Sequence, residues 1–204
     1  MKLQIRNTFE QDFRTTEDIT REAFWDVYKP GCDEHLVLHQ LRKSKEYIKE
    51  LDFVALLNDK IIGHIISSKA RVIDAGGKEH EVLCVGPLCV LPEYQKQGIG
   101  SELMKRSIST AKDLGFRGMI LFGNPDYYHR FGFKNAAEYR ITTKDNQNFE
   151  AFMALELRDE GLSTVTGKFY EDNAFEIKSK ALEEFENNFP HREKHITGTQ
   201  LREK

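Results

Sequence analysis

The sequence has few of the features that mark secreted, membrane-spanning or nucleic-acid-binding proteins. It has three cysteines, an odd number, so a framework of structural disulfides is not expected. No apolar stretch approaches the roughly 18 residues of a transmembrane helix, and residues 1–6 lack the apolar core of a signal peptide. The formal charge of −3 gives no general basic field for nucleic acid. We therefore expect a cytoplasmic protein with neither nucleic acid nor membrane as a partner.

The length and the order of patterns predict one α/β (α+β) domain. A chain of 204 residues can bury a sizeable core. Helices are expected after Thr15 or Thr16 and after Asp33, the second running as far as Ile48. The expected strands are residues 2–7, 53–57, 61–72, 81–91 and 119–122, with a closing antiparallel pair at 138–142 and 151–157.

The most informative segment is a glycine-rich turn at residues 95–100, Gln-Lys-Gln-Gly-Ile-Gly, between an apolar run and a helix-periodic run. A strand that turns through glycines into a helix presents unpaired N–H groups and the positive end of a helix dipole, which suits a phosphate. No Lys-Ser or Lys-Thr follows either glycine, which excludes a Walker P-loop. Leu103 stands where a dinucleotide fingerprint needs its third glycine. A tight turn without any ligand stays open at this point.

The segments on both sides of this turn favour a ligand site. Upstream, the apolar run 82–92 is interrupted by Gly86 and Pro87, and proline cannot donate to a central ladder, so the strand must bulge or part from its neighbour there. Downstream, apolar residues recur at helical spacing from Leu103 until Gly115 ends the helix. The turn is therefore expected to join a disrupted buried strand to an amphipathic helix.

The Gln-x-x-Gly-x-Gly pattern resembles the acetyl-CoA pyrophosphate loop of the GNAT acetyltransferase superfamily. Residues 88–95 resemble the GNAT strand that pairs with the pantetheine arm of the cofactor. Residues 123–133 resemble the GNAT segment in which a tyrosine, here Tyr128, faces the cofactor sulfur. The Tyr-Tyr-x-Arg-Phe-Gly-Phe form of this segment, with the Gly-Pro-Leu-Cys-Val strand, is similar to the YhbS-like branch of acetyltransferases.

The resemblance implies a GNAT fold, a mixed and mostly antiparallel sheet with splayed central strands flanked by helices. This domain would cover residues 1–172. Residues 173–204 would form a C-terminal helix and polar tail that pack on the domain or extend it, with covering a substrate groove and forming a homodimer contact as the two alternatives. Phe175, Leu182, Phe185 and Phe189 follow helical spacing there.

The implied activity is transfer of acetyl from acetyl-CoA to a primary amine by direct attack in a ternary complex, without a metal. The acceptor is a small-molecule amine, a protein N-terminus or a lysine side chain. The alternative is an acyl-CoA-binding regulatory module without turnover. A covalent route through Cys89 is a further alternative.

Roles for individual residues follow from this chemistry. N–H groups from Gln97 to Ser101 can hold the diphosphate, with Gly98 and Gly100 allowing close approach of the backbone. The resemblance implies that the N–H of Leu88, or of Cys89 in another register, stabilises the oxyanion. It also implies that Tyr128 protonates the thiolate. The implied cofactor-binding residues are Leu88, Cys89, Val90, Gln95, Lys96, Gln97, Gly98, Ile99, Gly100, Ser101, Asn124, Tyr127, Tyr128 and Arg130.

The acceptor side is less defined. The amine must lose a proton, but Cys84 occupies the position at which some GNAT enzymes carry a glutamate base. Glu81 is the catalytic candidate for this role, His80 is an alternative, and ordered water is a third. Phe24 and Trp25 either line the acceptor pocket or belong to the core. His35 and His39 lack a His-Glu-x-x-His pattern and are expected on an ordinary helix face.

Overall fold

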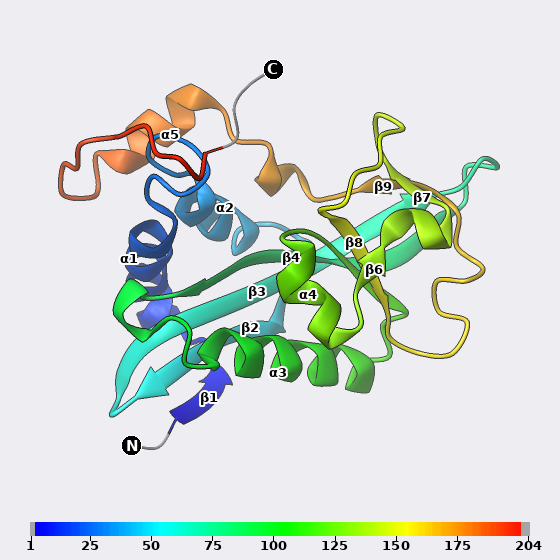
Figure 1. The fold of residues 1–204 in the computed structure, drawn as a ribbon, viewed down its shortest axis with the longest axis horizontal. Coiled ribbons are helices and arrows are strands. Elements are labelled where there is room, and N and C mark those ends of the chain that lie inside the picture. Colours follow the sequence, from blue (N-terminus) through cyan, green and yellow to red (C-terminus); the bar gives the residue numbers. More distant parts are fainter. Residues whose placement is uncertain (1–2, 201–204) are drawn as a thin grey trace.

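Residues 3–200 are described by a computed structural model, in which nine strands of these residues pair in one mixed sheet (Figure 1). The strands are β1 (Leu3–Asn7), β2 (Tyr47–Leu57), β3 (Lys60–Ile73), β4 (Glu79–Val90), β5 (Gly118–Phe122), β6 (Lys134–Asn135), β7 (Ile141–Thr143), β8 (Phe152–Glu156) and β9 (Gly167–Tyr170). Their main order is β1-β2-β3-β4-β5-β8-β6, and β9 pairs with both β3 and β7. The β4–β5 and β7–β9 pairs are parallel, whereas the other described pairs are antiparallel.

Helices cover both faces of the sheet. They are α1 (Phe13–Phe24), α2 (Glu34–Leu41), α3 (Ile99–Asp113), α4 (Pro125–Tyr128) and α5 (Ser179–Glu186). Side chains alternate along β3, so Gly63 faces Leu103 of α3, while Ile66 packs with Leu41 of α2 on the opposite face. Figure 1 shows α3 on one side of the strands and α1, α2 and α5 on the other.

The strands β4 and β5 separate halfway along their length. They pair only at Leu83 with Met119 and at Cys84 with Ile120. Shortly after this point the β3–β4 ladder contains a bulge, because two steps along β3 correspond to three steps along β4 across Gly86 and Pro87. The predicted irregularity at these two residues is confirmed. Beyond it, the edge of β4 that faces β5 has no partner strand within the described residues.

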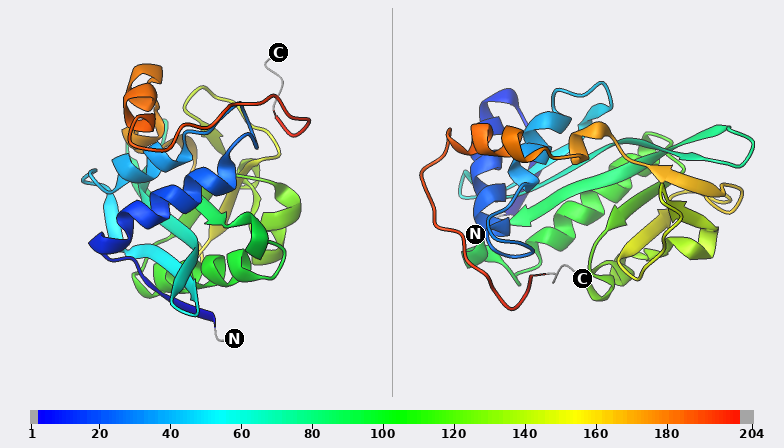
Figure 2. Two further views of the ribbon diagram at one scale, coloured as in Figure 1. Left: turned by 90° about the vertical axis from the view of Figure 1, so that its left-hand side faces the viewer. Right: turned by 90° about the horizontal axis from the view of Figure 1, so that it is seen from above.

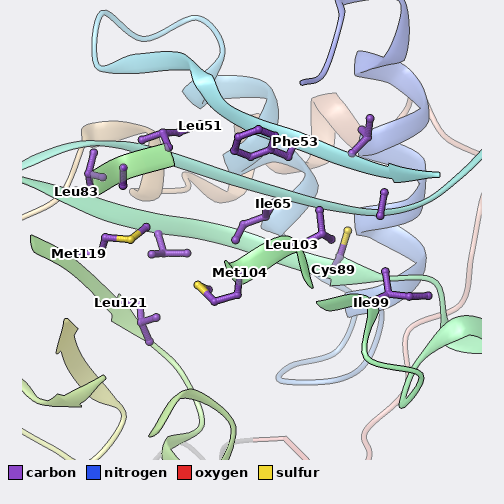
Figure 3. Close-up of a cluster of buried hydrophobic side chains, with 14 of the residues drawn as sticks. Leu51, Phe53, Ile65, Leu83, Cys89, Ile99, Leu103, Met104, Met119 and Leu121 are labelled. Atoms are coloured by element: carbon purple, nitrogen blue, oxygen red, sulfur yellow. The ribbon is translucent and has the colours of Figure 1, made fainter. Parts of the chain in front are cut away.

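One core cluster fixes the helix that follows the glycine-rich turn. Ile99 and Leu103 of α3 are buried in the same cluster as Leu83 of β4 and Met119 of β5 (Figure 3). Burying a side chain of this size contributes about 1.5–3 kcal/mol. The start of α3 is therefore held in a fixed position against the splayed strands.

The starts of the first two helices differ from the sequence prediction. α1 begins at Phe13, so Thr15 and Thr16 lie inside the helix instead of capping it. Asp33 does precede α2, but its side chain makes no capping hydrogen bond. Ile48 lies in β2, because the N–H groups of Lys43 and Ser44 close a turn after Leu41 and end the helix there.

The predicted closing pair of strands is also wrong. Residues 138–142 and 151–157 do not pair with each other. Arg140 has a left-handed conformation (φ 58°), which breaks the first segment into a 3-10 turn and the short strand β7. β7 pairs in parallel with β9, a strand that the sequence prediction missed, while β8 lies between β5 and β6.

The C-terminal helix α5 packs on α1 and α2. Glu186 lies 2.8 Å from Arg21 of α1 and 2.7 Å from Nε2 of His35 in α2, although the ring N–H lacks the alignment of a hydrogen bond. The rings of Phe185 and Phe189 lie 5.4 and 5.0 Å from the ring of His35. Burial lowers the pKa of His35 to about 4, so the imidazole is neutral at pH 7. From Glu186 the chain continues along α1 and the loop after it (Figure 2).

The part of the chain that the structure describes contains no helix that is both long and apolar enough to cross a membrane.

Candidate active site

The glycine-rich turn has the left-handed backbone that its sequence suggests. After β4 a 3-10 turn, Pro92–Tyr94, leads to Gln95, whose side-chain amide donates to the carbonyl of Val90 at 3.0 Å. Lys96 (φ 59°) and Gly98 (φ 85°) are left-handed, and α3 begins at Ile99. A Cβ on Gly98 would meet no atom within 4 Å, so the space in front of it is open. The sequence motif thus forms a turn that opens outward.

The first turn of α3 carries free N–H groups. Its first helical bond runs from the N–H of Glu102 to the carbonyl of Gly98 at 3.1 Å. The N–H groups of Ile99, Gly100 and Ser101 have no acceptor among residues 3–200. Together with the positive end of the helix dipole, these groups make a site that favours an anion such as a phosphate.

The segment 123–133 borders this helix start. A Cβ on Gly100 would lie 2.8 Å from the hydroxyl oxygen of Tyr127, so a larger residue there would displace this side chain. The Arg130 guanidinium lies 4.9 Å from the ring centre of Tyr127. Asn124 instead caps α4, because its side-chain oxygen accepts the N–H of Asp126 at 3.0 Å. Tyr127 and Arg130 therefore lie near the turn, while the Asn124 oxygen has a structural role.

The open edge of β4 presents its own N–H groups. The N–H of Leu91 donates to Ile62 of β3 at 2.9 Å. Hydrogen-bonded and non-hydrogen-bonded pairs alternate along an antiparallel ladder. Cys89 lies two positions before Leu91 and opposite His64, so this pair is hydrogen-bonded as well. The N–H of Cys89 therefore points toward β3, whereas those of Leu88 and Val90 point toward the open edge. Of the two candidates for an oxyanion donor, Leu88 has the suitable direction.

Tyr128 packs against the core cluster that contains Ile99 and Leu103 of α3. Its ring occupies the space in which a Cβ on Gly123 would lie, and it makes edge contacts with Tyr127 and Phe133 at centroid distances of 5.0 and 5.7 Å. Burial, with Tyr127 and Tyr28 nearby, raises the pKa of Tyr128 above its ordinary value near 10. The phenol therefore keeps its proton through the neutral range and can act as a donor.

A cavity of about 660 Å³ lies between the end of α1 and the open edge of β4. Its lining includes Phe24, Trp25, Tyr28, Leu88, Val90 and Arg192. Trp25 is only 7% exposed, and its indole N–H donates to the carbonyl of Glu193 at 2.9 Å. Both aromatic residues predicted for the acceptor side thus line a cavity that reaches Leu88.

Cys89 is unsuited to nucleophilic attack. Its side chain turns toward α1, where the sulfur lies 3.3 Å from the hydroxyl oxygen of Thr20, and it is 3% exposed. Burial raises its pKa to about 12, so the thiolate is scarce at neutral pH. This environment is that of a small buried apolar residue.

Glu81 lies apart from these groups. It is seven positions before Leu88 on β4, which corresponds to about 23 Å along a strand. Its carboxylate is exposed and lies 3.0 Å from Lys69. It borders a different cavity, of about 800 Å³, together with His80, whose ring lies 3.0 Å from Asp74. The structure does not bring Glu81 or His80 to the glycine-rich turn, although the cavity around them is the larger of the two.

Sequence reasoning missed two residues at the smaller cavity. Tyr28 follows Phe24 at a distance of four residues, and the two rings are 6.1 Å apart. The concentration of aromatic residues just before Pro30-Gly31 was a usable signal for Tyr28. Arg192 comes from the C-terminal tail, and no local pattern relates it to α1.

The histidines of α2 have partners of their own. Nδ1 of His39 lies 2.7 Å from Glu17, and Nδ1 of His35 lies 3.5 Å from the sulfur of Cys32. Within residues 3–200 no group of three or more His, Cys, Asp or Glu side chains is arranged to hold a metal ion.

The arrangement of a splayed sheet with a glycine-initiated helix at the split is that of the GNAT fold. Residues 11–133 match the acetyltransferase (GNAT) family, and the chain belongs to this family. It is therefore an acyltransferase of the N-acetyltransferase type.

Several relatives share the sequence or the structure. The N-acetyltransferase YhbS of Escherichia coli strain K12 is 27% identical over 135 residues, which cover 66% of this chain and 78% of YhbS. A crystal structure of Escherichia coli YhbS in complex with CoA has a TM-score of 0.77 at 24% identity, covering 87% of this chain and 93% of that one. A GNAT acetyltransferase from Brucella melitensis, in complex with acetyl-CoA, has a TM-score of 0.70 at 28% identity, covering 85% and 98%.

Proposed function

We propose that the protein transfers an acetyl group from acetyl-CoA to a primary amine by direct attack within a ternary complex. The observation that carries this proposal is the open edge of β4 leading into a helix start with free N–H groups at Ile99, Gly100 and Ser101. One continuous surface therefore offers donors for an extended amide-bearing arm and then for a diphosphate. The two structural relatives with CoA or acetyl-CoA bound support the same reading.

Each step of the transfer has a candidate group. The amine nitrogen attacks the thioester carbonyl, and the N–H of Leu88 stabilises the oxyanion that forms. As the tetrahedral intermediate collapses, the C–S bond breaks and the phenol of Tyr128 gives its proton to the leaving sulfur. The resulting phenolate of Tyr128 then recovers a proton from water. The side-chain amide of Gln95 donates a hydrogen bond to the carbonyl of Val90 and so stabilises the turn that precedes the diphosphate site.

Direct transfer is favoured over a covalent intermediate. The cysteine beside the cavity, Cys89, has a raised pKa and is buried beside Thr20, so it offers neither a thiolate nor access. The amine proton leaves through ordered water in this proposal, because Glu81 lies at the far end of β4 and Cys84 is fully buried. Phe24 and Trp25 form the acceptor side of the cavity.

The test has two stages. Acetyl-CoA should bind in isothermal titration calorimetry, and free CoA thiol should then appear in the presence of primary amines, measured with a thiol reagent. Binding without turnover on any small amine, peptide N-terminus or lysine peptide would favour an acyl-CoA-binding regulatory module. Absence of binding by acetyl-CoA would refute the proposal.

Gly98→Val is expected to weaken acetyl-CoA binding by about tenfold or more. A β-branched residue is strained at φ 85°, so the first turn of α3 must change and its N–H groups lose their alignment. Losing one hydrogen bond to a charged group costs about 1.5–3 kcal/mol, and 1.4 kcal/mol is a factor of ten. The dissociation constant from calorimetry measures this effect.

Gly115→Val is the matched control for this variant. Gly115 ends the same helix with φ 82°, and a Cβ there would also meet no atom within 4 Å. The two substitutions therefore bring similar backbone strain at opposite ends of α3. If both variants bind acetyl-CoA with equal affinity, the glycine-rich turn is not the diphosphate site.

A further inference from the structure

The C-terminal strap, defined here as residues 191–200, lies along the end of α1 and the loop that follows it (Figure 2). Its hydrogen bonds go to successive residues of this loop. The indole of Trp25 donates to Glu193, Thr197 donates to the carbonyl of Asp26 at 2.8 Å, and Thr199 donates to the carbonyl of Val27 at 2.7 Å. The strap therefore binds the segment that carries the aromatic residues of the cavity.

The loop held by the strap has an unusual backbone. Asp26 is left-handed (φ 60°), a conformation that L-residues adopt only when the surroundings hold it. Its carboxylate accepts the N–H groups of Gly31 and His195 at 2.7 and 3.1 Å. The Asp26 side chain thus accepts one hydrogen bond from within the loop and one from the strap. The strap is part of what fixes the position of Trp25 and Val27.

The strap also contributes a side chain to the cavity itself. Arg192 lines the cavity, lies 5.3 Å from the ring of Trp25, and forms an ion pair with Glu22 at 2.6 Å. Within the described chain, Glu22 and Arg192 are the two charged residues of the lining, and they are bound to each other. The rest of the lining is apolar or aromatic except for Gln95 and Cys89.

We propose that the strap forms the outer wall of the acceptor cavity and that Arg192, by neutralising Glu22, restricts the cavity to primary amines carried on an uncharged, apolar body. The inference rests on the proposed function, because it assigns this cavity to the acceptor. A cavity with aromatic walls and an internally paired charge offers contact area to an apolar body and no free carboxylate to a second ammonium group.

The position of the strap is tested without activity, because Trp25 is the single tryptophan of the chain. In the full-length triple variant Arg192→Ala, His195→Ala, Thr197→Ala, three side-chain contacts of the strap are lost. Emission from Trp25 should shift to longer wavelength and acrylamide should quench it more strongly. Lys180→Ala, on an exposed side chain of α5, is the control and should leave the emission unchanged. Equal spectra for the triple variant and the wild type would overturn the strap as a wall.

Selectivity is tested with two named amines, 2-phenylethylamine and 1,4-diaminobutane. The wild type should favour 2-phenylethylamine in kcat/KM. Arg192→Ala frees Glu22 for the second ammonium of the diamine. The preference should therefore fall about three- to fivefold, which is the size of effect that one partly exposed ion pair produces. Arg192→Lys keeps the charge and should keep most of the preference. A wild type that prefers the diamine, or an unchanged ratio in Arg192→Ala, would overturn the proposal.

Calorimetry with acetyl-CoA separates this inference from the proposed function. Arg192→Ala should bind acetyl-CoA with wild-type affinity, because the glycine-rich turn is unaltered. A wild type that does not bind acetyl-CoA would refute the proposed function and the acceptor role together. A wild type that binds and transfers acetyl, with the same amine preference in Arg192→Ala, would refute the role of the strap alone.

Discussion

Tyr128→Phe should lower kcat for amine acetylation by about a hundredfold or more, while the dissociation constant of acetyl-CoA changes by less than about threefold. General acid catalysis typically contributes 10²–10⁴-fold, and phenylalanine keeps the ring but has no proton to give. The ring fills the space beside Gly123 and packs on Phe133, so the variant should fold as the wild type does. Steady-state kinetics under saturating acetyl-CoA give kcat, and calorimetry gives the affinity.

Tyr127→Phe is the matched control, because it removes the neighbouring hydroxyl. That hydroxyl lies above the start of α3, near Gly100, and not beside Gly123. Its loss should change acetyl-CoA affinity more than kcat. If Tyr128→Phe keeps the wild-type kcat at neutral pH, or if Tyr127→Phe loses more of it, Tyr128 is not the proton donor.

The pH profile adds an independent test of the same role. A general acid must be protonated, and burial raises the pKa of Tyr128 above the ordinary phenol value of about 10. The wild-type kcat should therefore show no alkaline fall due to this group below about pH 10. A fall in kcat between pH 7 and 9 that disappears in Tyr128→Phe would contradict the raised pKa.

The sequence predicted the parts of the structure that depend on local chemistry. Gly98 initiates α3 with a positive φ, Gly115 ends it with another, and the bulge falls at Gly86-Pro87. Each of these depends on what glycine or proline permits in the backbone at that position. The separation of β4 from β5 had a different source, because the splayed central strands were implied by the resemblance to GNAT proteins.

The errors arose where a local pattern suited two structures. Ile48 continues the apolar spacing of α2, but the same residue also fits the alternation of β2, and the turn after Leu41 decides between them. Thr15 and Thr16 are good capping residues by type, yet Thr16 lies inside α1 and donates back to the carbonyl of Phe13. Helix ends are thus set by the packing of the whole helix as well as by its capping residues.

Contacts between distant segments could not be predicted from one sequence. Arg192 reaches Glu22 across 170 residues, and β9 pairs with β3 and β7 without a distinctive pattern of its own. The proposed acceptor side of the site depends on such contacts, whereas the glycine-rich turn does not. This difference explains why the candidate anion site was predicted in detail, whereas the prediction for the proposed acceptor side was limited to Phe24 and Trp25.

A buried polar network beneath α1 was missed for the same reason. The carboxylate of Asp52 in β2 accepts hydrogen bonds from four side chains. Its partners are Thr8, Nε of Arg42 at 3.0 Å, the hydroxyl of Tyr47 at 3.0 Å and Nε2 of His64 at 2.7 Å. Asp52 and His64 are fully buried, and Arg42 also donates to Thr16 of α1 at 2.8 Å. The network thus joins the sheet to α1, the helix that precedes the loop with Trp25 and Asp26.

Asp52→Asn should lower the free energy of unfolding by about 3–5 kcal/mol. Removing one partner of a buried ion pair leaves the other charge uncompensated, and the Arg42 side chain is 3% exposed. The asparagine side chain has nearly the same shape, so the loss comes from charge and hydrogen bonding and not from a cavity. Urea unfolding at pH 7, followed by circular dichroism, measures the change. Glu81→Gln removes one charge from an exposed pair with Lys69 and should change stability by less than about 1 kcal/mol.

The contribution of Asp52 should also depend on pH. Burial alone would raise the pKa of Asp52, but His64 and Arg42 together hold it well below its ordinary value. Because the pKa in the folded state lies below the value of about 3.9 in the unfolded chain, the stabilisation is complete above that pH and is lost as the pH falls below it. Asp52→Asn should lack this loss, so the two unfolding curves should approach each other in acid. A difference between them that stays constant from pH 7 down to pH 3 would mean that the carboxylate charge is not what Arg42 requires.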